Sequence, residues 1–321
     1  MNVQRQGILL KPEEEIGAIF NPGAIIYEEA IYLFPRVILK GYKKKKSGAG
    51  YENYISEIWI ARSTDGKNFK LLGPLIKPDR DYDRFGCEDA RITKLGNEYF
   101  ITYTALSSPA FSGEGYRIGL ASTKNFKSVV KHTIIGPDLN DKNAVLFPEK
   151  INGKVALLHR IKFNIYIVFF DDVQQLKQNH SEEFWNNYLQ ELESHLVLKK
   201  EYPWESKKIG SGPPPIKTKA GWLLIYHGVD KNRVYRVGMA LLDLENPKKV
   251  IAKSPLPILE PETEYEKIGD IPNVVFPTGA IVKNKKLFLY YGAADKRCCS
   301  ACYNFDELLD YLLSMENNSK N

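Results

Sequence analysis

The chain has 321 residues, of which 43% are hydrophobic, and a formal net charge of +6. This apolar content excludes wholesale disorder and is enough for a sizeable buried core. The length exceeds the usual size of about 150 residues per domain, but all-β folds often reach it as one unit, so we expect a single domain over 1–321. The 19 tyrosines and 15 phenylalanines favour strands.

Targeting and metal-binding signals are missing from the sequence. No stretch reaches the roughly 18 apolar residues of a membrane span, and the first residues lack the apolar core of a signal peptide, so we expect a cytoplasmic protein with no membrane partner. Cys298, Cys299 and Cys302 are clustered, but no second pair or nearby histidine completes a zinc site. We expect buried thiols and no metal.

Much of the positive charge lies in one run, Lys43 to Lys46. Such a run is typical of a solvated loop or of an anionic-ligand or nucleic-acid patch. Because no nucleic-acid motif accompanies it, we interpret it as a solvated loop and expect no nucleic-acid partner.

Five segments share one plan: a short apolar strand, a polar turn and a second strand rich in aromatic residues. In chain order they begin at Gly23, Glu88, Phe147, Pro214 and Phe276. Turns such as Asn152-Gly153 between apolar runs are strong hairpin signals. The hairpins recur at roughly 55–70 residues and are followed by further strands, which is the period of a four-stranded propeller blade. The sequence therefore predicts an all-β fold, a five-bladed β-propeller.

Two segments interrupt this pattern. Residues 181–198 predict a helix inserted after the third blade, because Ser181 can cap it and apolar residues recur every four positions. Residues 306–315 predict a short C-terminal helix. We expect both helices to serve core packing or a subunit contact, and the inserted helix offers a surface for a homo-oligomer.

Equivalent strands of a propeller surround a central channel, where ligands bind. Alignment of the second hairpin strands places polar or aromatic residues at similar points of all five repeats. This alignment predicts a polar pocket on the axis. The aligned residues are Arg36, Tyr103, Arg160, His227 and Tyr291.

Glu88 and Asp89 precede an apolar strand and are flanked by Arg84 and Arg91. This pattern fits either a surface charge cluster or a carboxylic acid held among cations and positioned to donate a proton. In the third repeat, Arg160 follows an apolar run at a strand end. Its guanidinium fork matches the geometry of a phosphate.

Several motifs together resemble glycoside hydrolase family 130, the mannosyl phosphorylases and related β-mannosidases. The resemblance covers Asn21 to Asp295, runs through all five repeats and implies a five-bladed propeller, which the repeat count predicts separately. The motifs are CEDAR at 87–91, NAVLFPEKINGK at 143–154, KIGSGPPPIKT at 208–218, GMALLDLENP at 238–247 and YYGAAD at 290–295.

The resemblance also implies residue roles. Asp89 matches the catalytic acid of the family. Lys142 stands where the phosphorylases usually have arginine, so it keeps the charge but loses the bidentate fork. The implied phosphate-binding residues are Lys142, Asn143, Arg160, Lys208 and His227. The implied substrate-binding residues are Asn21, Arg36, Glu88, Arg91, Tyr226 and Asp295.

We therefore expect inverting phosphorolysis of a terminal β-mannosyl linkage, with inorganic phosphate as co-substrate and no cofactor. An inverting β-mannosidase is an alternative that needs a second carboxylate to activate water, for which Glu205 and Asp270 are candidates. A non-catalytic glycan-binding propeller is a further alternative. The linkage, β-1,4 or β-1,2, is left open, and we expect the loops at 42–54 and 107–115 to form the walls around the acceptor sugar.

Overall fold

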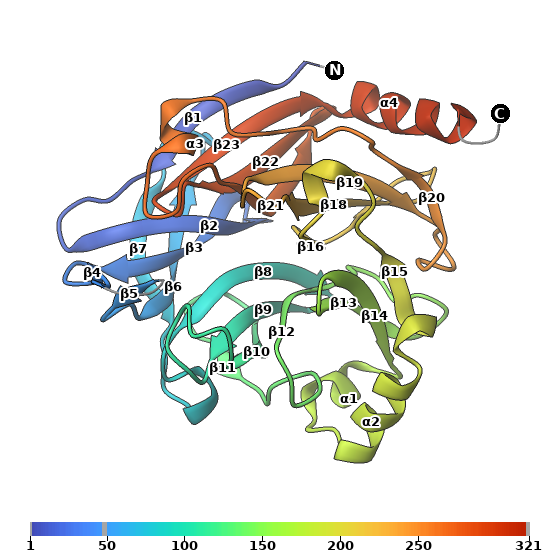
Figure 1. Ribbon diagram of the computed structural model, residues 1–321, viewed down its shortest axis with the longest axis horizontal. Helices are drawn as coiled ribbons and strands as arrows, with labels where there is room; N and C mark the ends of the chain where they lie inside the picture. Colours follow the sequence, from blue (N-terminus) through green and yellow to red (C-terminus); the bar gives the residue numbers. More distant parts are fainter. Residues whose placement is uncertain (1, 47–49, 319–321) are drawn as a thin grey trace.

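The computed structural model describes residues 2–46 and 50–318 and arranges them mainly as five antiparallel sheets around a central axis (Figure 1). This arrangement confirms the predicted five-bladed β-propeller. Most strands of a blade pair with the next strand along the chain, because antiparallel strands can be joined by tight turns.

The first three blades follow the chain from the inner strand outwards. The first blade contains β2 (Ile16–Tyr27), β3 (Ala30–Leu39), β6 (Ser56–Ser63) and β7 (Lys70–Ile76). The second contains β8 (Cys87–Leu95), β9 (Glu98–Leu106), β10 (Tyr116–Thr123) and β11 (Val130–Lys131). The third contains β12 (Asp141–Leu146), β13 (Val155–Ile161), β14 (Asn164–Phe170) and β15 (Leu196–Leu198).

The last two blades close the ring. The fourth contains β16 (Lys208–Ser211), β17 (Ile216–Lys217), β18 (Trp222–Val229), β19 (Tyr235–Leu242) and β20 (Val250–Lys253). The fifth contains β21 (Val275–Lys283), β22 (Lys286–Ala293), β23 (Arg297–Asn304) and, as its outer strand, β1 (Gln4–Leu10). The N-terminal strand therefore completes the last blade as its edge strand and joins the two ends of the chain in one sheet.

The core lies between neighbouring blades. Phe100 and Leu120 of the second blade pack with Leu157 of the third, and Leu224 of the fourth packs with Leu158 of the third. Side chains alternate between the two faces of a strand, so each blade packs apolar side chains from one face against the preceding blade and from the other face against the following blade. This explains why the second hairpin strands are apolar along most of their length.

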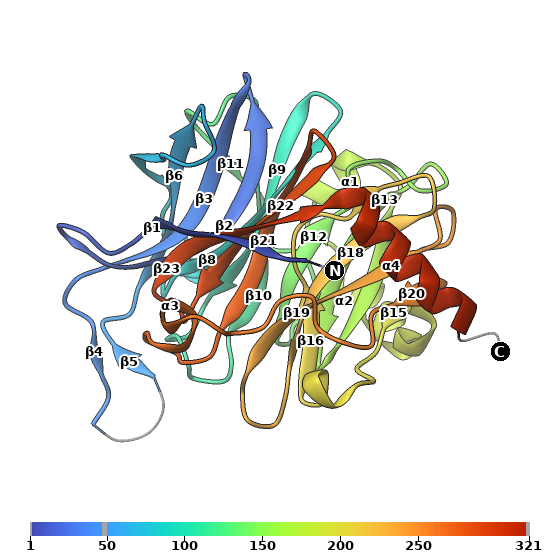
Figure 2. The same ribbon diagram turned by 90° about the horizontal axis from the view of Figure 1, so that it is seen from above.

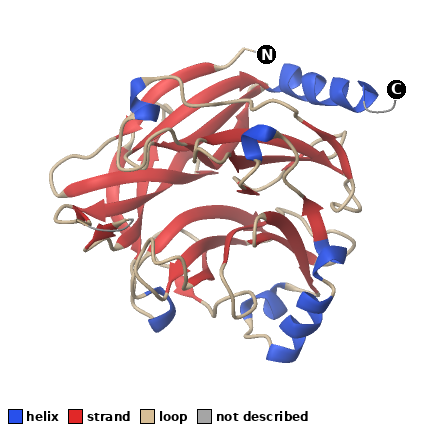
Figure 3. Ribbon diagram, in the orientation of Figure 1, coloured by secondary structure: helices blue, strands red, loops and turns tan. Residues whose placement is uncertain are grey.

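Helices lie at the periphery of the propeller (Figure 3). The prediction of one helix over 181–198 is wrong in extent: α2 (Glu182–Gln190) follows α1 (Val173–Lys177), and a 3-10 turn leads into β15. Residues 196–198 are a strand because Leu196 and Leu198 pair with β14, so the helices are inserted inside the third blade rather than after it. The predicted cap is confirmed, since the Ser181 hydroxyl accepts a hydrogen bond from the Phe184 amide.

The predicted C-terminal helix is confirmed as α4 (Phe305–Asn318), and the remaining helix is α3 (Glu264–Lys267). Leu308 and Leu312 of α4 are fully buried against the fourth and fifth blades. Seen from above, α4 lies beside the N-terminus at the edge of the ring (Figure 2). The run of lysines at 43–46 contains β4 (Lys43–Lys44), which pairs with β5 (Tyr51–Glu52) in a separate hairpin.

A buried network recurs in the second, fourth and fifth blades. In the fourth, the Tyr226 hydroxyl donates to Glu205 at 2.8 Å, and Lys253 Nζ lies 2.5 Å from the same carboxylate. The carboxylate also accepts hydrogen bonds from the backbone amides of Glu201 and Tyr202 in its own turn. The equivalent sets elsewhere are Tyr103, Asp83 and Lys131, and Tyr291, Glu266 and Arg5. These networks fasten the inner loop of a blade to its outer strand.

All four cysteines are buried free thiols. Within residues 2–46 and 50–318, no group of three or more histidine, cysteine, aspartate or glutamate side chains could hold a metal ion. No helix of these same ranges is long and apolar enough to cross a membrane.

Candidate active site

A cavity of about 310 Å³ opens where strands of the five blades meet at the axis. It draws side chains from every blade, which confirms a polar pocket at the place the repeats predict. Ten of the predicted site residues line it: Asn21, Arg36, Glu88, Asp89, Lys142, Asn143, Arg160, Lys208, His227 and Asp295.

Three of these residues occupy the same structural position in successive blades. Asn21, Asp89 and Asn143 each follow a regular pair with the second strand and begin a one-residue bulge in the inner strand. All three have left-handed backbone conformations, with φ of 50°, 56° and 58°. Bulges re-aim side chains, and asparagine and aspartate tolerate this backbone better than most residues.

The second strands supply the residues that face these bulges. Arg36 pairs with Phe20 and Arg160 with Lys142, each directly before the bulge of the inner strand, and His227 pairs with Gly210 in the regular ladder of the fourth blade. In the second and fifth blades the same register position is held by Thr104 and Gly292.

The predicted placement of Tyr103 and Tyr291 on the channel is therefore wrong by one residue. In a strand, a shift of one residue moves a side chain to the opposite face. Both tyrosines instead belong to the buried networks described above: the Tyr103 hydroxyl donates to Asp83 and the Tyr291 hydroxyl to Glu266. Tyr226 is corrected for the same reason: it is fully buried, bonds Glu205 and does not line the cavity.

Carboxylates gather on one side of the cavity. Asp89 Oδ1 accepts a hydrogen bond of 2.7 Å from Asn21 Nδ2, and it lies 3.6 Å from an Arg36 nitrogen. The other terminal nitrogen of Arg36 lies 2.5 Å from Glu88. Burial raises the pKa of Glu88, and burial together with Asp89 raises that of Asp295 to about 7. Burial alone would lower the pKa of Arg36, but Glu88 reverses the effect and raises it.

Arg91 lies behind the bulge rather than in the cavity. Its guanidinium donates to the backbone oxygen of Asp89 at 2.5 Å and to the carbonyls of Ser211 and Gly212 at 3.3 Å. It is 1% exposed, and burial lowers its pKa to about 10. Arg91 thus ties the bulge of the second blade to the fourth blade and supports Asp89 from behind.

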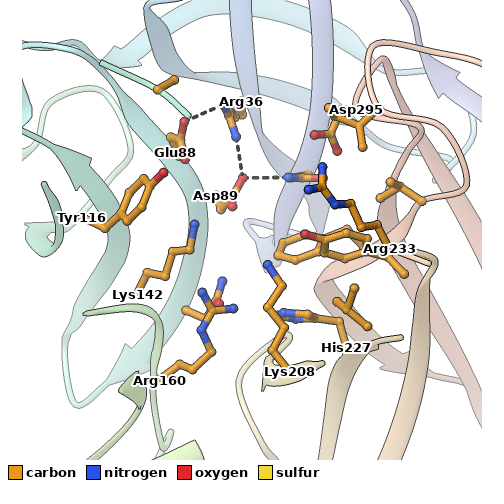
Figure 4. Close-up of a pocket in the computed structure, with 18 of the residues that line it drawn as sticks. Arg36, Glu88, Asp89, Tyr116, Lys142, Arg160, Lys208, His227, Arg233 and Asp295 are labelled. Atoms are coloured by element: carbon orange, nitrogen blue, oxygen red, sulfur yellow. Dashed lines mark hydrogen bonds and ion pairs between the residues drawn. The ribbon is translucent and has the colours of Figure 1, made fainter. Parts of the chain in front are cut away.

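Basic groups gather on the other side, as Figure 4 shows for Lys142, Arg160, Lys208 and His227. Burial, reinforced by Arg160, lowers the pKa of Lys142 to about 8 and that of Lys208 to about 6. Burial and the neighbouring Arg160 hold the pKa of His227 well below its usual range. Several cations crowded in one enclosed place repel one another, and this arrangement favours binding of an anion.

Polar atoms on this side lack partners among the described residues. Asn143 Oδ1, Arg160 Nε and both ring nitrogens of His227 are buried and make no hydrogen bond there. Buried polar groups are normally hydrogen-bonded, so their convergence on one cavity marks a ligand-binding surface. The donors and cations suit an oxyanion such as phosphate.

Two tyrosines that the sequence analysis missed complete this surface. Lys142 Nζ lies 4.2 Å from the centre of the Tyr116 ring, and Lys208 Nζ lies 5.2 Å from that of Tyr235. Both tyrosines begin the third strand of their blades, in the repeated pattern Tyr-Arg-x-Gly. This repeated pattern is the sequence signal from which the two tyrosines could have been predicted as cavity residues. The cavity is also lined by Ala110, Phe111, Lys207, Val229, Arg233, Ile271, Val274 and Phe276.

The two candidate bases for hydrolysis lie elsewhere. Glu205 is fully buried and held by Tyr226 and Lys253. Asp270 bonds the Tyr42 hydroxyl and lies 2.9 Å from Lys296 Nζ. Neither residue lines the cavity.

A propeller whose axial cavity sets carboxylates against a cluster of cations defines an enzyme-like site for a polar substrate together with an anion. The family of beta-1,4-mannooligosaccharide phosphorylases, glycoside hydrolase family 130, matches the chain over residues 3–314. The chain belongs to this family.

Similar proteins include two from Thermoanaerobacter sp. (strain X514). A 1,2-beta-oligomannan phosphorylase is 42% identical over 286 residues, which cover 88% of this chain and 88% of that protein. A beta-1,2-mannobiose phosphorylase is 41% identical over 287 residues, covering 88% and 89%. Among solved structures, the beta-1,2-mannobiose phosphorylase from Listeria innocua in complex with beta-1,2-mannobiose superposes with a TM-score of 0.80 at 30% identity, covering 97% of this chain and 99% of that chain.

Proposed function

We propose that this protein catalyses inverting phosphorolysis of a terminal β-1,2-mannosyl linkage, forming α-mannose 1-phosphate and a shortened glycan. The observation that carries the proposal is the cluster of Lys142, Arg160, Lys208 and His227, which faces Asp89 across one cavity. A hydrolase has no need to collect four buried basic groups opposite its acid. A phosphorylase needs them to bind its nucleophile.

In this mechanism, phosphate binds between Lys142, Arg160 and Lys208. The Arg160 fork pairs with two phosphate oxygens, and His227, which is neutral, donates one ring hydrogen. A phosphate oxygen attacks the anomeric carbon while the bond from that carbon to the bridging oxygen breaks. Attack from the face opposite the leaving group inverts the configuration, so a β-mannoside gives an α-phosphate.

Asp89 supplies the proton that the leaving oxygen needs. It is 6% exposed, its position is fixed by the bulge, and Arg91 supports it from behind. Because phosphate is already an anionic nucleophile, no second carboxylate is required to activate it. Glu205 and Asp270, the two carboxylates considered as a base for hydrolysis, lie away from the cavity, so neither can activate a water molecule there.

Residues on the carboxylate side of the cavity would hold the mannosyl unit, and the loops above it would contact the acceptor sugar. Asn21, Arg36, Glu88 and Asp295 offer donors and acceptors for the hydroxyls of the mannosyl ring. Phe111, from the predicted acceptor wall, lines the cavity and packs on Tyr51 and Tyr54 of the hairpin at 42–54, of which 47–49 lie outside the described residues. The β-1,2 linkage is proposed because the similar proteins named above are described as acting on it.

The experiment is to incubate the protein with β-1,2-mannobiose, with and without inorganic phosphate, and with β-1,4-mannobiose as a linkage control. The proposal predicts phosphate-dependent formation of mannose 1-phosphate plus mannose from the β-1,2 disaccharide. Equal release of free mannose with and without phosphate would show a hydrolase. Preference for the β-1,4 disaccharide would overturn the proposed linkage and leave the phosphorylase intact.

A further inference from the structure

Asn21 lies beside Asp89 in a tightly enclosed position. Its side-chain amide donates to Asp89 Oδ1 at 2.7 Å, and the two residues are 4% and 6% exposed. Its left-handed backbone, with φ of 50°, turns the side chain out of the regular alternation of β2. The hydrogen bond joins the bulge of the first blade to that of the second.

Gly292 makes room for this side chain. A Cβ atom at Gly292 would lie 1.8 Å from Asn21 Oδ1 and 2.7 Å from the Asn21 backbone nitrogen. The backbone of Gly292 has no left-handed conformation that would itself require glycine. Its register position is the one that Arg36, Arg160 and His227 hold in other blades. The fifth blade therefore has no side chain at this position, and Asn21 of the first blade fills the space.

We infer that Asn21, seated against Gly292, is a positioning residue that decides which oxygen of Asp89 carries the proton. The amide of Asn21 donates a hydrogen bond to Oδ1, and the nearer nitrogen of Arg36 lies 3.6 Å from the same oxygen as an ion pair. An oxygen that accepts a hydrogen bond and faces a cation is the unprotonated one of a carboxylic acid. The transferable proton is thereby held on Oδ2. This inference rests on the proposed role of Asp89 as the acid.

Removal of the amide should lower kcat by about 10- to 100-fold, because the proton is no longer confined to the productive oxygen. The KM for phosphate should stay unchanged, because Asn21 bonds Asp89 on the carboxylate side of the cavity. The other ionisable groups near Asp89 are Arg36, Glu88, Arg91, Lys142, Arg160, Tyr235 and Asp295.

Three variants separate this role from a structural one. Asn21→Gly removes the amide but keeps a residue that adopts positive φ readily. Asn21→Asp keeps the shape, replaces the donor with an acceptor and should lower kcat at least as far. Gly292→Ala leaves Asn21 in the chain but displaces it. The matched control is Asn284→Gly, since Asn284 has a φ of 51° in the β21–β22 turn and does not line the cavity.

The test is kcat and the KM for phosphate in cleavage of β-1,2-mannobiose, with folding checked by thermal midpoint. We expect Asn21→Gly and Gly292→Ala to share the loss of kcat with an unchanged KM for phosphate, while Asn284→Gly matches the wild type in both constants. A loss of activity that comes from a raised KM for phosphate would overturn the inference, as would an unchanged kcat in folded variants. If one variant fails to fold, the other two still decide.

The outcome also separates this inference from the proposed function. A wild type that releases free mannose and no mannose 1-phosphate would refute phosphorolysis, but the kcat of that hydrolysis in the three variants would still test Asn21, because either reaction uses the acid. A wild type that cleaves no β-mannoside would overturn both.

Discussion

Asp89 and Asn143 occupy the same bulge position in neighbouring blades, with φ of 56° and 58°. One carries the proposed proton donor and the other an amide on the phosphate side of the cavity. The two roles are thus built from one local backbone device, repeated about the axis. The two residues differ in their own side chains, a carboxyl and an amide, and in their neighbours: Arg36 and Asn21 adjoin Asp89, whereas Asn143 lines the cavity together with Arg160 and His227.

Asp89→Asn tests the acid directly. The substitution keeps the shape and the left-handed backbone but removes the transferable proton, so we expect kcat to fall by roughly 10²–10⁴-fold. Binding of phosphate, measured by calorimetry, should remain. Asp138→Asn is the control, because Asp138 is 92% exposed. Undiminished turnover by a folded Asp89→Asn protein would refute the assignment.

Arg160→Lys tests the phosphate site. Lysine keeps the charge but cannot reproduce the bidentate fork, so the KM for phosphate should rise by about tenfold or more while the KM for the mannoside changes little. Initial rates over a grid of both substrates measure the two constants. A rise confined to the mannoside constant would place Arg160 in the sugar site instead.

The pH dependence of phosphate binding follows from the two lysines. Their pKa values, about 8 for Lys142 and about 6 for Lys208, are lowered by burial and by Arg160. As pH rises from 6 to 9, the free enzyme loses positive charge at these positions, so the KM for phosphate should increase.

Lys142→Arg provides the comparison, because arginine stays protonated throughout this range. Its KM for phosphate should rise less steeply with pH than that of the wild type. The ionisation of phosphate itself affects both enzymes equally. Identical pH dependence in the two would show that Lys142 does not titrate in the binding step.

The buried network of the fourth blade should matter for stability. Glu205→Ala leaves Lys253 and the Tyr226 hydroxyl without their carboxylate partner, and breaking a buried ion pair costs about 3–5 kcal/mol. We expect a clearly lower midpoint in urea unfolding. The control is Glu201→Ala. The Glu201 side chain is 53% exposed, and its carboxylate lies 3.6 Å from Lys253 Nζ, farther away than the buried Glu205 carboxylate. Equal midpoints for the two variants would contradict the structural role.

The overall fold could be predicted from the sequence because the repeated hairpins define both the blade and the number of blades. The bulges could not, since the inner strands are buried on both faces and show no alternation that an extra residue would shift. Without them the alignment slipped by one residue at Tyr103 and Tyr291, and a slip of one places a side chain on the wrong face.

The site was predicted best where a motif fixes a position, as at Asp89 and Asn143. It was predicted worst where burial decides whether a side chain faces the cavity or the interior of a blade. Tyr226 adjoins His227 in a strand, yet the first bonds Glu205 inside the blade and the second faces the cavity. The end of the predicted helix at 181–198 was wrong for a related reason: pairing with β14, a tertiary contact, makes 196–198 a strand.

In the proposed reaction, phosphate held by the basic cluster attacks the mannosyl unit opposite Asp89. Time-resolved ¹H and ³¹P NMR of β-1,2-mannobiose with phosphate identifies the product formed first and its anomeric configuration. We expect α-mannose 1-phosphate, formed together with one equivalent of mannose. β-Mannose 1-phosphate, or free mannose released without any phosphate ester, would refute the proposed reaction.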